Sequence, residues 1–215
     1  MCHTRRLVTG FVLATVAIST AAHAQSALAG VLGGVNVSTF GGNDARAAKE
    51  RTGLVGGAFL SIESNPRFAI ETGAFYSQRG GELPGGSAGG TFRFRVDYVE
   101  IPVLAVFRSP IRTKVDPFFG IGGAVGIRVG CQLSTTSANS SLASDCSLLA
   151  GGSTSAFNSN DLGAVGELGV DTRGVRFVLR FNLGLTSVDA SGSGASIQNR
   201  TLSLLVGYGF RIGGD

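Results

Sequence analysis

Apolar and polar residues alternate with a period of two over long stretches of this 215-residue chain. In residues 174–186 every second side chain is apolar, and the opposite face carries Arg176 and Arg180. Residues 201–212 repeat this two-faced pattern. Because neighbouring side chains of a β-strand point to opposite faces, a period of two is typical of a strand with two different environments. Both segments are therefore predicted to be strands.

The same test identifies eight strands along the chain, an even number. They span residues 28–38, 53–62, 67–78, 91–107, 117–131, 162–170, 174–186 and 201–212. The segments between them are alternately short and long. The short or moderate ones are 64–67, 108–116 and 172–174, and the long ones, rich in Gly, Ser, Asn and Ala, are 40–52, 79–90, 132–160 and 188–198.

This alternation predicts an all-β fold, an eight-stranded antiparallel up-and-down transmembrane β-barrel of an outer membrane. In such a barrel the short turns and both termini face the periplasm and the long loops lie outside the cell. The strand 91–107 changes polarity between its faces near Tyr98. The change indicates either a bulge or a strand that extends beyond the membrane before Tyr98.

A soluble lipocalin-like barrel, acting as a periplasmic ligand carrier, is the alternative architecture. Its apolar face would line a ligand cavity and its charged face would meet water. Only 15% of the residues are charged, and the polar faces hold glycines and isolated charges. Such faces would make a poor soluble exterior, so the pattern favours the membrane barrel.

The first 24 residues have the features of a cleaved secretory signal peptide. Arg5 and Arg6 precede the mostly apolar, uncharged run 7–22, and Ala22-His23-Ala24 is a small-x-small cleavage site. The sequence thus predicts a signal peptide at 1–24 and an outer-membrane β-barrel domain at 25–215. The protein is expected to cross the inner membrane and reach the cell outer membrane.

Removal of this segment takes away both histidines, His3 and His23, and one of the three cysteines, Cys2. Catalysis and metal binding by histidine are therefore excluded, and neither an enzyme activity nor a cofactor is expected. Because two of the 18 Lys and Arg residues are lost and all 14 acids remain, the net charge falls from +4 to +2. This small charge gives no support for nucleic-acid binding.

Cys131 and Cys146 are the two cysteines that remain. An exported chain meets oxidising conditions, in which pairing is the default. We therefore predict a disulfide between them that closes a polar loop outside the cell.

Charged residues on the polar faces are expected to point into the barrel. They are Glu71, Glu100, Arg128, Glu167, Arg176, Arg180 and Arg211. The interior of an eight-stranded barrel is just wide enough for its own side chains, so these charges are expected to pair and plug it. A narrow ion path along them is the alternative. Tyr76, Tyr98 and Tyr208 are placed near strand ends, where they fit an interfacial aromatic girdle.

Four runs of the sequence resemble successive blocks of the PorT-like outer-membrane β-barrel family. They are residues 30–38, 70–80, 98–104 and 117–122. Similar alternation of Gly and aromatic residues occurs in OmpX-like and OmpW-like barrels. The resemblance covers the mature chain and implies a small porin-like barrel of a Gram-negative outer membrane.

The C-terminal strand also resembles the insertion signal of outer-membrane barrels. Gly207, Phe210 and Ile212 match its glycine and two apolar positions, whereas Leu205 stands where a polar residue is usual. This resemblance implies two partners, the barrel-assembly machinery during insertion and outer-membrane lipid afterwards. The sequence does not identify an extracellular or periplasmic partner.

The function expected from these features is a structural or interaction role, with surface-exposed loops on a plugged barrel. A porin-like narrow channel or a secretion-system component is the alternative.

Overall fold

The computed structural model describes residues 26–41, 49–84, 91–109, 114–137, 140–145, 160–186 and 198–213. The predicted signal peptide and Cys146 lie outside these residues. No helix in the described part is long and apolar enough to cross a membrane.

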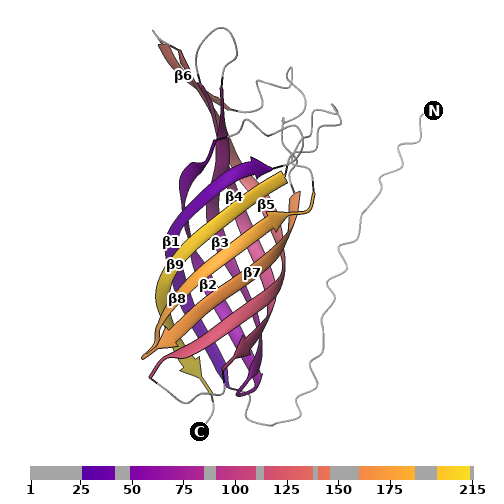
Figure 1. Ribbon diagram of the computed structural model, residues 1–215, viewed down its shortest axis with the longest axis vertical. Helices are drawn as coiled ribbons and strands as arrows, with labels where there is room; N and C mark the ends of the chain where they lie inside the picture. The colour runs from indigo at the N-terminus through magenta and orange to yellow at the C-terminus, as the bar shows by residue number, and fades with distance from the viewer. Residues whose placement is uncertain are drawn as a thin grey trace, which may run out of the picture.

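Nine strands make up the described fold (Figure 1). They are β1 (Ala27–Gly41), β2 (Arg51–Asn65), β3 (Phe68–Pro84), β4 (Thr91–Arg108), β5 (Asp116–Ser137), β6 (Ser140–Asp145), β7 (Asn160–Thr172), β8 (Val175–Gly184) and β9 (Gln198–Ile212). All of them except β6 form a ring in which each strand pairs antiparallel with the next and β9 pairs back with β1. The predicted closed eight-stranded antiparallel barrel is therefore confirmed.

One end of the barrel, here named the turn end, gathers the short turns and both ends of the described chain. Ala27 pairs with Ile212 there. Main-chain hydrogen bonds link Arg108 N to Arg67 O and Gly209 N to Gly174 O. The β7–β8 turn needs only two residues, because Arg173 (φ 49°) and Gly174 (φ 86°) both adopt positive φ, as a type I′ hairpin turn requires.

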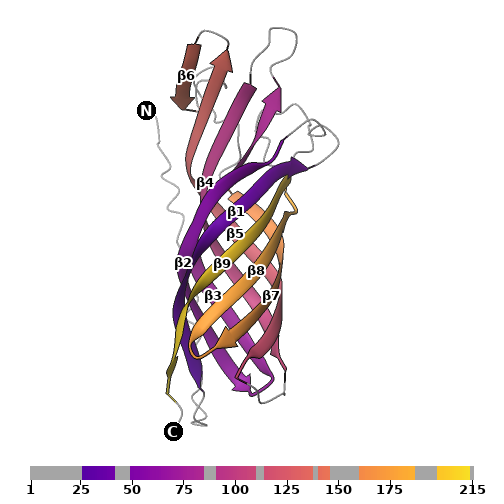
Figure 2. The same ribbon diagram turned by 60° about the vertical axis from the view of Figure 1, so that its left-hand side comes forward.

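At the opposite end, named the extended end, part of the wall continues past the ring (Figure 2). Along β5, residues 116–127 pair with β7, whereas residues 132–137 pair with β6. The segment 132–160, predicted as an irregular loop, therefore begins as a β-hairpin. Serine, threonine and alanine predominate in the sequence of this hairpin and give no sustained alternation of polarity, which is why the alternation test missed it.

A bulge lies beside Tyr98, and its extra residue belongs to β5. Asp97 pairs with Gly130 and Tyr98 with Arg128, which leaves Val129 without a partner residue on β4. The bulge leaves the inward face of β4 unchanged, since Val96, Tyr98 and Glu100 are all buried. The polarity change instead coincides with the extension of β4: its residues 91–97 pair with residues 130–136 of β5, which lie past the part of β5 that pairs with β7.

The two faces of the wall have opposite character. On β8, Phe177 and Phe181 are 46% and 47% exposed, whereas Arg176 and Arg180 between and beside them are buried. Apolar residues that do point inward form two clusters, and the larger one includes Leu32, Phe59, Phe75, Leu104, Phe118 and Leu205. A soluble lipocalin-like carrier would have its charges outside, so this alternative is wrong.

Candidate functional site

The barrel interior is the part of the described structure where charged side chains converge. Inward-facing positions of β3, β4, β7 and β8 carry acids and arginines that the period of two brings to one side of the wall. They form three groups along the barrel axis.

The first group surrounds Arg176 near the turn end. Its Nη1 lies 2.7 Å from Glu71 Oε2, and its Nε and Nη2 lie 2.8 and 3.1 Å from the two carboxylate oxygens of Asp171. The guanidinium also lies over the rings of Phe59 and Phe118, at 4.4 and 4.5 Å from their centroids. A planar guanidinium is suited to this combination of two-point pairing and stacking.

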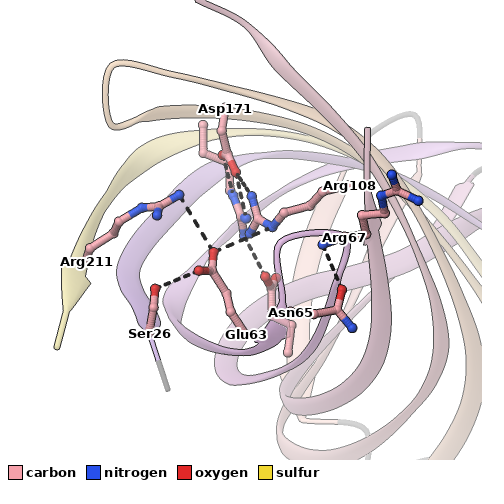
Figure 3. A network of polar contacts seen from close by, with 9 residues as sticks. Ser26, Glu63, Asn65, Arg67, Arg108, Asp171 and Arg211 are labelled. Atoms are coloured by element: carbon pink, nitrogen blue, oxygen red, sulfur yellow. Dashed lines mark hydrogen bonds and ion pairs between the residues drawn. The ribbon is translucent and has the colours of Figure 1, made fainter. Parts of the chain in front are cut away.

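Asp171 extends this group to the mouth of the barrel at the turn end (Figure 3). Arg108 Nη1 lies 2.7 Å from Asp171 Oδ2, and Arg108 Nε lies 3.9 Å from Glu63 Oε1. Ser26 donates a hydrogen bond of 2.6 Å to Glu63 Oε2. The network therefore ties the start of β1 to the ends of β2, β4 and β7.

Arg211 reaches the same mouth from outside. Its Nη2 lies 3.9 Å from Glu63 Oε1, and its side chain is 68% exposed. The prediction that Arg211 is an interior charge is wrong. Along β9, alternate residues point inward, and Arg211 has this inward parity. It is, however, the next-to-last residue of the strand, where the wall no longer encloses it.

The second group is the buried pair of Arg180 and Glu167. The two residues are direct partners on β8 and β7, and Arg180 Nε donates a short hydrogen bond to Glu167 Oε1. The guanidinium lies 4.3 Å from the ring centroid of Phe75. Predicted as interior charges from their parity, both residues are confirmed as buried.

The third group lies toward the extended end. Arg79 Nη2 is 2.5 Å from Glu100 Oε2, and Arg79 Nη1 is 3.6 Å from Asp161 Oδ2. Asn199 donates a hydrogen bond of 2.9 Å to Asp161 Oδ2. Arg79 also lies 5.6 Å from the ring centroid of Tyr98.

This position of Tyr98 corrects the predicted aromatic girdle. The residue is 1% exposed and faces the interior, because it lies two residues from the buried Glu100 on the same face of β4. Tyr76 and Tyr208 do face outward and are 41% and 55% exposed. Arg128 has inward parity and is half-buried.

Sequence reasoning missed five charged members of these groups, namely Glu63, Arg79, Arg108, Asp161 and Asp171. The predicted strand 67–78 ends one residue before Arg79, which follows Ser77 on the inward face of β3. Asp161 precedes the predicted start of its strand by one residue. Extending the alternation past the predicted strand ends would have found both.

Uncharged polar side chains fill the space between the groups. Asn36 Nδ2 donates to Ser77 Oγ at 2.8 Å, and Ser203 Oγ donates to Asn36 Oδ1 at 2.6 Å. In the described part, each buried arginine contacts a carboxylate, and no group of three or more His, Cys, Asp or Glu residues could hold a metal ion. The described interior therefore contains paired charges at three levels of the lumen.

Comparison with known proteins agrees with this architecture. The sequence matches the outer membrane protein beta-barrel domain family over residues 23–190. The chain belongs to this family.

Solved structures similar to this family member are also outer-membrane barrels. The outer membrane protein OprG from Pseudomonas aeruginosa is 13% identical with a TM-score of 0.50, over 88% of this chain and 97% of that one. Ail of Yersinia pestis is 11% identical with a TM-score of 0.43, over 86% of this chain and 99% of that one. The outer membrane enzyme PagL is 11% identical with a TM-score of 0.41, over 85% and 98%. No curated protein matches the sequence.

Membership of an outer-membrane barrel family explains the apolar outer surface. At the turn end, the outward-facing Phe68, Phe107 and Phe119 lie side by side on β3, β4 and β5. The ring centroids are 5.3 Å apart for the first two and 4.8 Å apart for the last two, which are stacked. Phenylalanines thus form part of an aromatic belt on these strands, next to a polar mouth.

The C-terminal residues of the predicted insertion signal lie on the seam that closes this family member's barrel. Phe210 and Ile212 face outward and are 55% and 49% exposed. A Cβ atom on Gly207 would lie only 1.8 Å from Val31 O on β1. The fold therefore requires glycine at 207, whereas the role of this strand in insertion stays a prediction.

Cys131 lies on β5 in a small cluster with Val96 and Tyr98. Cys146 is outside the described residues, so the disulfide stays a prediction. Its support is that Gln132 and Asp145, the sequence neighbours of the two cysteines, pair directly across the β5–β6 hairpin.

Proposed function

We propose that this protein is a non-conducting outer-membrane barrel that displays the sheet of β3, β4, β5 and β6 outside the cell as an interaction surface. The observation that carries the proposal is the β5–β6 hairpin, which the continuation of β3, β4 and β5 past the ring holds at the extended end. A strand extension of this kind gives a rigid platform, because its main-chain pairing continues that of the membrane wall.

The paired interior supports a non-conducting role. Arg176, Arg180 and Arg79 occupy successive levels of the barrel, and each contacts a carboxylate and an aromatic ring. Opening a water-filled path would separate these buried pairs, which is costly when one charge is left without a partner. The interior therefore supports a structural plug. The interaction role is proposed for the extended sheet of β3, β4, β5 and β6.

A narrow channel or an export component, as the resemblance to PorT-like barrels implies, is the second candidate. One observation favours it: Glu100 Oε1, Glu167 Oε2 and Arg180 Nη2 are buried polar atoms with no hydrogen-bond partner in the protein. Such atoms along the lumen are suited to contact water. No catalytic role is proposed.

Processing and location follow the same proposal. The signal peptide 1–24 directs export, the barrel-assembly machinery inserts the chain through its C-terminal strand, and outer-membrane lipid surrounds the apolar band. The short turns and the two ends of the described chain then face the periplasm.

Conductance of the purified barrel in planar lipid bilayers separates the two candidates. The wild-type protein is expected to leave the current near its baseline. A variant with a shortened hairpin, lacking residues 135–144, serves as a matched control for leakage through the extension. A stable, ion-selective current from both proteins would contradict the proposed plug and favour the channel.

A further inference from the structure

The lipid-facing wall carries a hollow of about 400 Å³ over β5, β7, β8 and β9. Three of these strands, β7, β8 and β9, face the viewer side by side in Figure 1. The hollow is bounded by large apolar side chains, among them Ile121, Leu168, Leu179, Phe181 and Leu202. Its volume lies within the range of about 300–1,000 Å³ that is typical of pockets for small molecules.

Gly166 is the cause of the hollow. It lies at the middle of β7 and pairs with Ile121 on one side and Phe181 on the other. A Cβ atom at this glycine would have no neighbour within 4 Å. Ile121 and Phe181 are 61% and 47% exposed, so they project on either side of a position that has no side chain.

The chemistry of the lining restricts what fits. Each of the five bounding side chains is a hydrocarbon, and the buried Glu167 beside Gly166 directs its charge to Arg180 inside the barrel. A charged or hydrogen-bonding ligand would lose its water here without gaining a partner. The occupant must therefore be apolar.

The position of the hollow indicates which apolar occupant to expect. It lies within the outward apolar band of a member of an outer-membrane barrel family, so the surface around it is continuous with the face that contacts lipid. We propose that the hollow holds one acyl chain of an outer-membrane lipid, ordered against the wall between Ile121 and Phe181.

The shape of the hollow, rather than its hydrophobicity, favours binding of an acyl chain there over binding to a flat part of the wall. Lipid tails are as apolar as leucine, so burial of one tail in this wall gains nothing from leaving water. The gain comes from dispersion contacts on several sides of the chain, which a flat wall cannot supply. A side chain at 166 would take the place of the acyl chain.

Lipid carrying a nitroxide in mid-chain tests the proposal when the barrel is reconstituted in bilayers. The wild-type spectrum is expected to contain a motionally restricted component, and Gly166→Leu is expected to remove one restricted chain per barrel from it. The matched control is Gly56→Leu. Gly56 also lies on the outward face, on β2 away from the hollow, and the nearest atom to its added Cβ would be Leu32 O at 3.6 Å.

Both variants must first show the heat-modifiable gel shift of a folded barrel, which open space at Gly166 favours. Equal loss of the restricted component in both variants would overturn the proposal, because the component would then come from lipid around the whole wall. A second outcome would also overturn it. If Gly166→Leu converts a dimer in detergent to a monomer while the restricted component is unchanged, the occupant is a second copy of the chain.

Discussion

Individual arginines of the interior each combine the same two contacts, a carboxylate and an aromatic ring. Arg176 bridges Glu71 and Asp171 while it lies between two phenylalanine rings. Lysine offers a point charge and could not make the two-point contact and the stacking together. The identity of these residues as arginine is therefore part of how the lumen is filled.

Arg180 and Glu167 provide the sharpest test at this scale. Replacing either one alone with methionine leaves the other charge buried and unpaired, which is expected to lower the free energy of unfolding by about 3–5 kcal/mol. The double substitution Arg180→Met with Glu167→Met removes both charges at similar volume and is expected to recover most of this loss. Denaturant titration of the heat-modifiable band in detergent measures all three variants. Additive losses in the double variant would contradict the pairing.

Gly207 tests the seam between β1 and β9. Gly207→Val places a Cβ where the structure has only 1.8 Å to Val31 O, so the seam must open. The expected cost is at least about 3 kcal/mol, the upper end for atoms forced into filled space, and loss of the folded band on refolding. Gly56→Ala, at an open outward position, is expected to refold like the wild type. Normal refolding of Gly207→Val would show that the seam is looser than the structure has it.

Parity along a strand could be read from the sequence, but the position of a residue relative to the ends of the wall could not. Glu71, Glu100, Glu167, Arg176 and Arg180 were placed inside from parity alone, and all are buried. Tyr98 is misplaced because it lies two residues from Glu100 on the same face of β4, so both side chains point inward. Arg211 is misplaced because the sequence does not show where the wall stops enclosing β9. Contacts between distant strands, such as Arg79 with Asp161, depend on closure of the ring and have no signal in one sequence.

Strands as elements were predictable where one face meets lipid and the other meets the lumen. The structure extends most of them by a few residues, since pairing continues beyond the apolar band. The β5–β6 hairpin shows the limit of this approach. Serine, threonine and alanine predominate in the sequence 132–145 and give no sustained alternation of polarity, whereas the two strands are defined by their main-chain pairing.

The predicted disulfide belongs to this hairpin. Cys131 and Cys146 are the sequence neighbours of Gln132 and Asp145, which pair directly in this hairpin. Because the ring holds β5 independently, reduction is expected to cost less than the roughly 3 kcal/mol of a loop this size in a free chain. We expect reduction to increase protease cleavage within 132–160 while the heat-modifiable band persists. Free thiols in the natively exported protein would contradict the bond, and loss of the folded band on reduction would contradict its confinement to the hairpin.

The whole molecule is asymmetric along the barrel axis. Tight turns and the mouth network of Glu63, Arg108 and Asp171 close one end, and an extended sheet rises from the other. Alternation of short and long connections predicted this difference between the ends. It did not predict that the extension would be sheet. Ordered strands make the extension a fixed surface. It can bind partners outside the cell only if the extended end of the barrel faces the cell exterior.

Orientation in the cell is therefore the decisive prediction for the whole molecule. An epitope inserted between Ser137 and Ser140, at the tip of the hairpin, is expected to bind antibody on intact cells. The same epitope inserted after Asn65, in the β2–β3 turn, is expected to bind only after the outer membrane is permeabilised. Both insertions lie in connections outside the barrel ladder, so the folded band should survive and serve as the control. Labelling of the β2–β3 turn but not the hairpin on intact cells would reverse the topology and place the extended sheet in the periplasm, where its partner would have to be sought.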